Sequence, residues 1–290
     1  TIDSKGYKFT VAYEGDKTSV NLTLDKTDQD NIPPFAQLTN TIPNWSEAFG
    51  VGNLGPAMGN LRLWPIELFT NGTRQGVAHI NTPTYELSVV EGTSLTIARD
   101  MSLGTLKVIW SKRKTDWDDR LDLDGGPFPI ADTERHTNYD AETLEVQLSG
   151  STDNLEYVFG YYSLKDNAFT ANPQSFFGGG QVFAQNYSGS GDSKAFFGQV
   201  TWAIADKWDM TIGARSTEED KAGFKEYVGI ISAKGTGSFD DTTGTFILSH
   251  DYSENTNLYF KVADGFKAGG FNAESSNPFA AATPYAPETI

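Results

Sequence analysis

Apolar and polar residues alternate along much of the chain with the period of two that is typical of β-strands. Residues 6–14 show this clearly, because every second side chain there is large and apolar. The apolar positions of this stretch are Tyr7, Phe9, Val11 and Tyr13. The same alternation flanks a short turn in each of the stretches 6–24, 85–110, 144–161, 196–214 and 246–262. The pattern predicts an all-β fold with about ten strands in five hairpins.

The predicted connections are of two kinds. Within the hairpins the turns are short, and they lie near Asp16, Gly104, Asp153, Asp206 and Glu254. Between the hairpins the links are long, and they run over Thr27–Pro83, Lys114–Asp140, Asp166–Ser193 and Glu218–Thr243. Compact soluble domains seldom contain long structureless links, whereas outer-membrane barrels combine tight periplasmic turns with long external loops. We therefore expect an antiparallel transmembrane β-barrel segment with short periplasmic turns at one end and long external loops at the other.

The two faces of the predicted strands suit two different surroundings. The face expected to meet lipid contains Tyr7, Phe9, Val146, Tyr157, Phe159, Trp202, Met210 and Ile212. The face expected to line a wet lumen contains Lys8, Glu14, Asn21, Asp25, Glu145, Gln147, Gln199, Thr201 and Arg215. A soluble antiparallel sheet with one solvated face alternates in the same way. A secreted β-sandwich that binds carbohydrate and a passive porin-like channel therefore stay open as alternatives.

Composition excludes other classes of protein. The 290 residues include no Cys, which removes disulfides, thiolate metal sites and cysteine nucleophiles. The 22 Lys and Arg residues stand against 38 Asp and Glu, and the resulting charge of -16 repels phosphate backbones, so nucleic acid is not an expected partner. No stretch approaches the roughly 20 consecutive apolar residues that a membrane helix needs.

Candidate catalytic and metal-binding patterns do not form in the sequence. His79, His136 and His250 fall in separate segments, and no Gly-x-Ser-x-Gly turn is present to carry a serine nucleophile. The acidic run 116–125 lacks the spacing of a calcium loop, because Arg120 replaces the first aspartate and Ala131 the twelfth-position glutamate. We expect no enzyme activity, no catalytic residue, no metal site and no cofactor.

One segment carries a family resemblance. Residues 257–272 read NLYFKVADGFKAGGFN, which resembles a signature of TonB-dependent receptor barrels, and a Pro-Glu pair follows where that family opens its next strand. Two further stretches are similar to the family, 195–215 and 144–162. The motif positions are Gly265, Phe266, Lys267, Gly269, Gly270, Phe271, Asn272, Pro287 and Glu288. We expect the glycines to shape the end of a strand, the two phenylalanines to anchor its rim at the lipid interface, and Lys267 to reach head groups or loop carboxylates.

The resemblance implies that residues 1–290 are a partial TonB-dependent receptor β-barrel domain. Members of the family also carry a signal peptide, a coupling box, a plug domain and further C-terminal strands, so we expect an internal fragment of such a receptor. It implies residence in the Gram-negative outer membrane and uptake of a scarce solute, with ferric siderophores the commonest class before cobalamin, haem and oligosaccharides. The implied partners are outer-membrane lipid and lipopolysaccharide, the TonB energy-coupling protein through the missing N-terminal region, and the small-molecule ligand.

The predicted external links hold the candidate ligand contacts. Aromatic side chains there can stack on sugars, catechols or flat chelates, or can simply pack the loops together. These residues are Trp45, Phe49, Phe176, Phe177 and Tyr187. Cations in the same links are few and lie among many carboxylates, which favours a neutral or cationic substrate, or recognition by the plug. They are Arg62, Arg74, Lys114, Arg135, Lys165, Lys221, Lys225 and Lys234.

Overall fold

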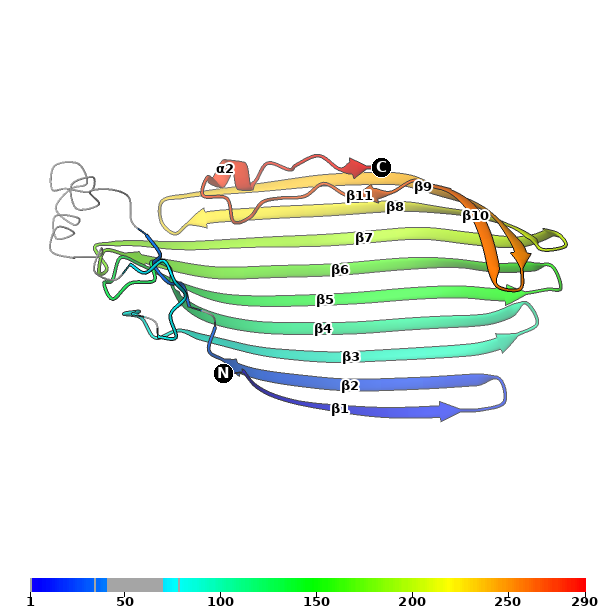
Figure 1. Cartoon of the computed structure of the whole chain (residues 1–290), viewed down its shortest axis with the longest axis horizontal. Coiled ribbons are helices and arrows are strands. Elements are labelled where there is room, and N and C mark those ends of the chain that lie inside the picture. The colour runs from blue at the N-terminus through cyan, green and yellow to red at the C-terminus, as the bar shows by residue number, and fades with distance from the viewer. Residues whose placement is uncertain (1, 34, 41–69, 78) are drawn as a thin grey trace.

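The computed structural model describes residues 2–33, 35–40, 70–77 and 79–290. Within these ranges, ten strands form one antiparallel sheet in which each strand pairs with the next along the chain (Figure 1). The strands are β1 (Ile2–Glu14), β2 (Thr18–Asn31), β3 (Tyr85–Met101), β4 (Gly104–Asp122), β5 (Ala131–Ser151), β6 (Leu155–Phe176), β7 (Gln181–Ala205), β8 (Trp208–Tyr227), β9 (Ile231–Ser253) and β10 (Thr256–Ala263). The predicted all-β fold of ten antiparallel strands is confirmed.

Residues 264–290, called the C-terminal segment below, leave the sheet after β10 and fold back across it. The segment contains β11 (Phe266–Lys267), the short helix α2 (Pro278–Ala281) and β12 (Glu288–Thr289). β11 and β12 pair with each other as a separate two-stranded sheet. The helix α2 contacts β8 and β9, and Figure 1 shows the segment lying over these two strands. A separate observation concerns helices in general: none among the described residues is long and apolar enough to span a membrane.

The short turns lie where the sequence placed them. They connect β1 to β2, β3 to β4, β5 to β6, β7 to β8 and β9 to β10, and Figure 1 shows them together at one end of the sheet. The expected long links are wrong in extent, because strands fill most of them. Residues 123–130, 177–180 and 228–230 are what remains of three of these links, and β2 continues to Asn31 before the first.

The extra strand length has a physical cause. A bilayer presents an apolar band of only about 25 Å to a barrel, whereas the 25 residues of β7 extend over roughly 80 Å. Much of the strand therefore lies beyond the hydrocarbon, where both faces meet water and apolar alternation is no longer required. The first half of β5, residues 131–143, is polar on both faces for this reason, and periodicity alone does not reveal it as a strand.

Cross-strand register separates the residues into two faces. Directly paired residues of antiparallel strands share a face, so a row of pairs can be followed across the sheet. One such row is Val20, Ile97, Val108, Val146, Tyr161 and Phe196. A second row is Trp202, Met210, Leu248 and Phe260. Glu145, Gln199 and Arg215 fall on the opposite face, as the sequence predicted, so the two faces are called the apolar face and the inner face.

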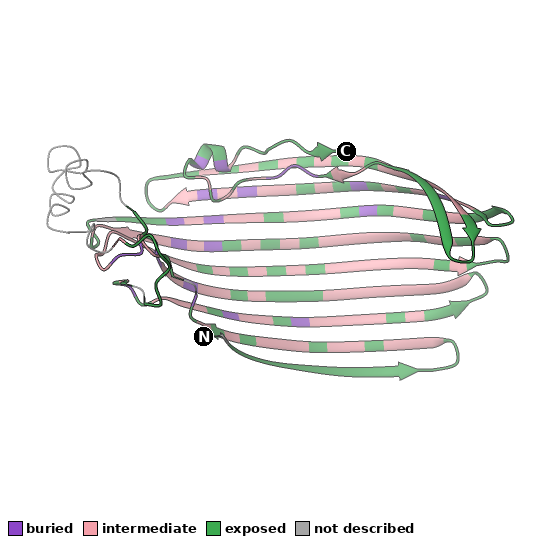
Figure 2. Cartoon of the chain, in the orientation of Figure 1, coloured by how far each residue is buried: buried purple, intermediate pink, exposed green. Residues whose placement is uncertain are grey.

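The apolar face is not covered by other parts of the described chain. Tyr7 is 67% exposed, Phe9 59%, Phe196 68% and Ile212 53%, although such side chains normally avoid water. Figure 2 shows the same pattern over the sheet, with intermediate and exposed positions predominating. No second sheet packs against this face within the described residues, as the β-sandwich alternative would require. An apolar surface of this extent marks a face that contacts a membrane or another apolar partner, and lipid is the partner that the sequence predicts.

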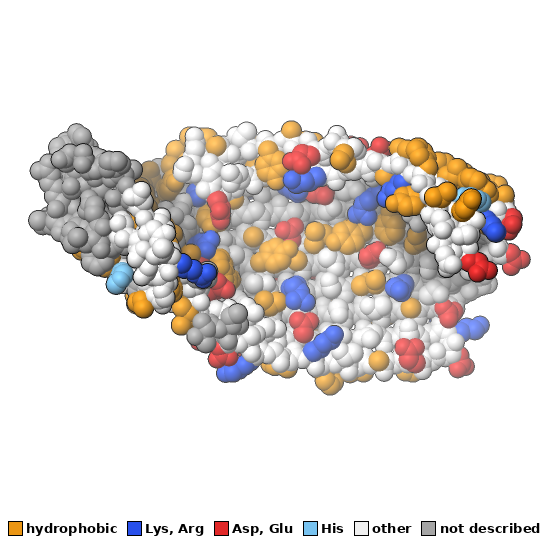
Figure 3. Space-filling model, viewed as in Figure 1, with side chains coloured by type: hydrophobic (Ala, Val, Ile, Leu, Met, Phe, Trp, Pro, Cys, Tyr) orange, Lys and Arg blue, Asp and Glu red, His pale blue; other side chains and the backbone are white. Residues whose placement is uncertain are grey.

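The inner face holds the polar and most of the buried side chains. Figure 3 views the sheet from the side of the C-terminal segment, and charged side chains of both signs are spread over that surface. Few hydrophobic side chains are buried among the described residues, among them Tyr187, Ala195, Ala268 and Ala281, whereas the buried polar ones are more numerous. The chain is thus built with its apolar surface outside and its hydrogen-bonded polar side chains inside.

Placing a charge on the apolar face tests this arrangement. In the full-length protein, we expect Ile212→Lys to lower the free energy of unfolding from lipid vesicles by about 2–4 kcal/mol, the cost of a lysine near the bilayer midplane. Gln199→Lys on the inner face is the matched control and should change it by less than about 1 kcal/mol. Equal losses in both variants, measured by urea titration, would contradict the assignment of the faces.

Candidate functional site

A patch of glycines on the inner face receives the C-terminal segment. Gly189 of β7, Gly223 of β8 and Gly235 of β9 are paired in one row, and Gly191 and Gly237 flank Lys221 in the next. These five residues are called the glycine patch below. The ring of Phe271 lies against Gly223, where an added Cβ would come within 2.6 Å of the ring. The missing side chains therefore create the space in which the segment lies.

Polar contacts fix the segment at its two ends and in the middle. Lys221 Nζ donates to the carbonyl of Gly269 at 3.1 Å, and Tyr227 Oη donates to the carbonyl of Ser276 at 2.9 Å. At the far end, the backbone N–H groups of Gly265 and Ile290 each donate to the other residue's carbonyl at 3.0 Å. The segment is thus held to the inner face by β8 and closed on itself by β11 and β12.

The family motif lies in this segment, with one correction. Lys267 reaches the carboxylate of Glu288 at 3.4 Å, in agreement with the expected contact to a carboxylate. Gly270 forms a β-bridge with Tyr285, beside a very close approach of the two backbones at Gly269. The expectation that Phe271 anchors the rim at the lipid interface is wrong. Its ring packs on the inner face instead, because the glycine patch leaves room for it there.

A pocket of about 230 Å³ opens on the inner face beside the C-terminal segment, and it is called the inner-wall pocket below. Its lining residues come from five strands, β4 to β8, from the loop after β4 and from the segment itself. Its lining residues are Leu121, Leu123, Thr133, Arg135, Asn172, Gln174, Gln185, Tyr187, Lys225 and Glu274. The lining combines amides, a hydroxyl group, an aromatic ring and charges of both signs, which is a composition suited to binding by hydrogen bonds.

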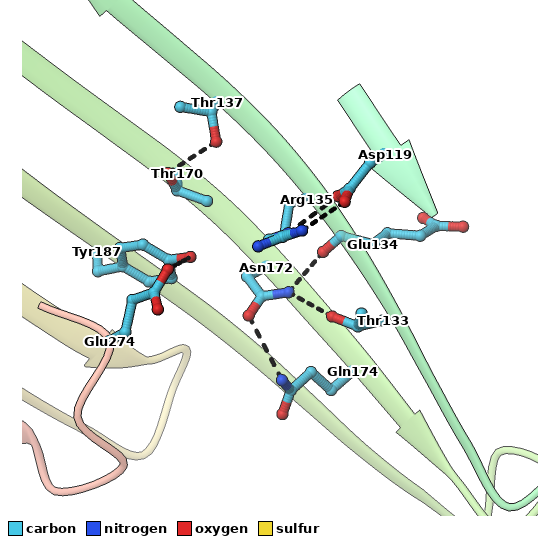
Figure 4. A network of polar contacts seen from close by, with 10 residues as sticks. All are labelled: Asp119, Thr133, Glu134, Arg135, Thr137, Thr170, Asn172, Gln174, Tyr187 and Glu274. Atoms are coloured by element: carbon cyan, nitrogen blue, oxygen red, sulfur yellow. Dashed lines mark hydrogen bonds and ion pairs between the residues drawn. The ribbon is translucent and has the colours of Figure 1, made fainter. Parts of the chain in front are cut away.

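Asn172 is the centre of an amide network in the pocket (Figure 4). Its Nδ2 donates to Thr133 Oγ1 at 2.7 Å and to the carbonyl of Glu134 at 2.6 Å. Its Oδ1 accepts from Gln185 Nε2 at 2.8 Å and from Gln174 Nε2 at 3.5 Å. Asn172 is only 5% exposed, so these contacts satisfy an amide that has lost its water.

Arg135 is held in place by its neighbours. Its Nε donates to Asp119 Oδ1 at 3.0 Å and its Nη2 to Asp119 Oδ2 at 2.5 Å, a two-point pairing seen in Figure 4. Its guanidinium also lies 4.6 Å from the ring centroid of Trp117. Asp119 is 2% exposed, and a buried carboxylate of this kind requires a cation beside it.

Lys225 is the second cation of the pocket and is 1% exposed. Its Nζ donates to Gln185 Oε1 at 2.6 Å and lies 4.6 Å from the ring centroid of Tyr187 and 5.7 Å from that of Tyr227. Glu274 of the C-terminal segment lies near Tyr187, whose Oη donates to the Glu274 carboxylate at 3.4 Å. The segment thus contributes a carboxylate to a pocket whose other walls come from the sheet.

The predicted ligand contacts are partly brought together. Tyr187 lies in the inner-wall pocket, while Phe176 and Phe177 lie at the turn between β6 and β7. The ring centroid of Phe183 lies 5.9 Å from that of Phe176 and 6.2 Å from that of Tyr227. Because Tyr227 also contacts Lys225, these rings form an aromatic cluster that extends from the turn toward Lys225. Trp45 and Phe49 lie outside the described residues.

The sequence analysis missed Asn172, Gln185 and Glu274. A signal for the first two existed, because they have the same strand parity as Thr170 and Tyr187 on the inner face. Their pairing with each other required the register of β6 and β7, which the sequence does not reveal. Among the predicted cations, Arg135, Lys221 and Lys225 lie on the inner face, whereas Lys114, Lys165 and Lys234 lie on the other.

The described residues contain no group of three or more His, Cys, Asp or Glu side chains that could hold a metal ion. The groups that the inner-wall pocket offers are amides, hydroxyls, an aromatic ring and charged side chains.

The family model described as "TonB dependent receptor-like, beta-barrel" matches residues 6–290. The chain belongs to this family. TonB-dependent receptors are transporters of the Gram-negative outer membrane and not enzymes, so the predicted family, localisation and absence of enzyme activity are confirmed. No curated protein matches the chain.

Solved receptors share the fold at low sequence identity. The ferric yersiniabactin uptake receptor FyuA from Yersinia pestis is 12% identical with a TM-score of 0.71, and the match covers 99% of this chain and 41% of that receptor. The siderophore receptor PiuA from Acinetobacter baumannii is 12% identical with a TM-score of 0.63, covering 99% of this chain and 46% of that one. The ferric citrate transporter FecA is 12% identical with a TM-score of 0.63, and the match covers 91% of this chain and 36% of that transporter. The chain thus spans less than half of each of these receptors.

Filling the glycine patch tests how the segment is held. In the full-length TonB-dependent receptor, Gly223→Ala should displace Phe271, whereas Gly189→Ala is the matched control because its Cβ has no neighbour closer than 4.0 Å. A cysteine introduced at Ala268, which is 5% exposed in the seated segment, reports displacement through its rate of thiol labelling. We expect Gly223→Ala to raise this rate by about tenfold or more and Gly189→Ala to leave it unchanged. Equal rates in both variants would show that the patch does not seat the segment.

Asp124 gives the loop after β4 a pH dependence. Burial raises the pKa of this carboxyl to about 6, the N–H of Ala131 opposes the rise by donating to it, and the charge of Asp122 adds to it. Because the folded pKa lies above the ordinary 3.8, protonation stabilises the loop. This contribution is complete below pH 3.8 and is lost as the pH rises through about 6.

Hydrogen exchange of the Gly126 and Ala131 amides, corrected for intrinsic rates, measures this effect. We expect stronger protection at pH 5 than at pH 7.5 in the wild-type receptor, and no such difference in Asp124→Asn, which keeps an acceptor oxygen without a titrating group. Asp153→Asn in the β5–β6 turn is the control and should retain the wild-type pH dependence. A pH dependence that survives in Asp124→Asn would assign it to another group.

Proposed function

We propose that this chain is the barrel portion of a TonB-dependent outer-membrane transporter that takes up a ferric siderophore. The family match over residues 6–290 supports active transport of a scarce solute. The structurally similar receptors named above are described as acting on ferric yersiniabactin, ferric citrate and siderophores, and these descriptions motivate the substrate class. The observation that carries the proposal is a polar inner wall with a hydrogen-bonding pocket behind an apolar outer face.

In this proposal the ligand is captured at the end of the sheet that lies opposite the short turns. The aromatic cluster at the β6–β7 turn meets the solute first, and the inner-wall pocket lies farther along the inner face on the same strands. Phe176 and Phe183 stack edge to face at 72°, which leaves ring surface available for a flat chelate. Trp45 and Phe49 are proposed to contribute to the same capture surface.

Energy coupling is assigned to parts of the receptor other than the sheet. A plug domain inside the barrel and the TonB protein that pulls on it are proposed partners, following the family. The polar residues near the short turns suit contact with such a plug. Thr105, Ser149, Gln199 and Thr201 line a shallow pocket of about 500 Å³ on the inner face at that end.

Lipid is the proposed partner of the opposite face. Beyond the apolar rows, this face carries cross-strand ion pairs between Lys26 and Glu91 at 3.1 Å and between Lys165 and Asp192 at 3.5 Å. Such a change from apolar to charged residues matches the boundary between hydrocarbon and head groups. Lipopolysaccharide is therefore the proposed neighbour of the charged rows.

A passive porin-like channel is the alternative to this proposal, and two observations favour the receptor over it. A porin keeps an open aqueous lumen, whereas here the C-terminal segment occupies the inner face of β8 and β9. The family match also favours a receptor with a plug over an open pore.

Uptake by the full-length receptor tests the proposal. We expect iron-limited cells that rely on this receptor to accumulate radioactive iron from a ferric siderophore only when TonB is present. The triple variant Trp45→Ala, Phe176→Ala and Phe177→Ala should weaken binding by roughly tenfold or more, since each stacking contact contributes about 0.5–1.5 kcal/mol. Phe169→Ala, on the apolar face of β6, is the matched control and should bind as the wild type does.

Two results would contradict the proposal. Uptake that persists without TonB would indicate a passive channel. Unchanged affinity in the triple variant would show that these aromatic side chains only pack the loops together, and the ligand would then be recognised elsewhere in the receptor.

A further inference from the structure

The charges of the inner-wall pocket are balanced within the protein. Two cations line it, Arg135 and Lys225, and two carboxylates stand beside them, Glu274 in the lining and Asp119 behind Arg135. Both cations are already engaged, the first by two hydrogen bonds to Asp119 and the second by Gln185 at 2.6 Å. The pocket therefore offers no excess positive charge to an incoming anion.

A bound anion would have to compete with these internal partners. Asp119 is 2% exposed, so drawing Arg135 away would leave a buried carboxylate without its cation, which is strongly unfavourable. Lys225 is 1% exposed and covered by the rings of Tyr187 and Tyr227. Glu274 lies at the surface of the pocket and would repel an anionic group directly.

Uncharged oxygen-bearing groups meet no such penalty. Gln174 is half-buried and shares only a long 3.5 Å contact with Asn172, so its amide retains capacity to donate and accept. The hydroxyl of Tyr187 makes a long 3.4 Å contact with Glu274, and as both donor and acceptor it can also bond a ligand oxygen. The side chain of Arg135 is 29% exposed, and the N–H groups beyond those held by Asp119 can donate to a carbonyl oxygen without breaking that pair.

We infer that the inner-wall pocket selects an uncharged ligand rich in carbonyl and hydroxyl oxygens, and that Glu274 on the C-terminal segment is the residue that excludes polyanions. This inference rests on the proposed function and narrows its substrate class. Among ferric chelates it assigns a neutral trihydroxamate type rather than a polyanionic tris-catecholate type. A neutral oligosaccharide shares the same chemistry, and the experiment separates the two sources.

The test measures binding of three probes to the purified full-length receptor by titration calorimetry. The probes are a neutral ferric trihydroxamate, a ferric tris-catecholate and a neutral oligosaccharide. We expect the trihydroxamate to bind at least tenfold more tightly than the tris-catecholate. Its affinity should change less than twofold between low and high salt, because binding without net charge is not screened.

A charge change within the pocket supplies the decisive variant. Glu274→Gln removes the carboxylate and keeps the shape, so the affinity for the tris-catecholate should rise at least fivefold while that for the neutral probe stays within twofold. Glu226→Gln is the matched control, because it removes the same charge from the residue next to Lys225 on the opposite face of β8. It should alter neither affinity.

The outcomes separate this inference from the proposed function. Tighter binding of the tris-catecholate than of the trihydroxamate by the wild-type receptor would overturn the inference and leave ferric uptake standing. Binding of the oligosaccharide alone would overturn ferric uptake and support an uncharged ligand. An effect of Glu226→Gln equal to that of Glu274→Gln would show that overall charge, and not the pocket, discriminates between the probes, and would overturn the role of Glu274.

Discussion

The hydrogen-bond register of the ten-stranded sheet decides which surroundings each side chain meets. Successive residues of a strand point to opposite faces, so a slip of one residue would send Val146 to the lumen and Glu145 into lipid. The pairing from β1 to β9 is nearly continuous, with an irregularity between Ala203 and Ala205. The apolar rows, the glycine patch and the inner-wall pocket all follow from that one alignment, because each is assembled from residues on different strands that share a row or a face.

How far the sequence predicts this structure depends on the solvent around each stretch. Within the bilayer the two faces meet lipid and water, so residues such as Val146 and Glu145 reveal both the strand and its orientation. Beyond the bilayer both faces meet water, and residues 131–143 show no apolar period although they are strand. The ladder continues there because cross-strand pairs stabilise it, including His136 with Asp118 at 2.6 Å. Such pairs depend on register, which no single segment contains.

The site was less predictable than the fold for a related reason. Tyr187 was predicted as a ligand contact from its chemistry, but its neighbours Lys225 and Glu274 lie 38 and 87 residues further along the chain. The path of the C-terminal segment was also hidden, since the glycines that seat it belong to β7, β8 and β9. Each of these glycines read alone is an ordinary loop or strand glycine. They form a surface that accepts Phe271 only because the strand register places them side by side on the inner face.

The negative charge of the chain and the neutral pocket act on a solute at different distances. The formal charge of -16 acts during approach, but at physiological salt it is screened beyond roughly 8 Å. Recognition then depends on groups in direct contact, where Asp119 and Glu274 already balance Arg135 and Lys225. Long-range repulsion and short-range balance therefore disfavour the same class of ligand, the polyanion. An uncharged solute is neither slowed by the field of the protein nor required to break a buried ion pair, and the amide of Gln174 can give it hydrogen bonds at little cost.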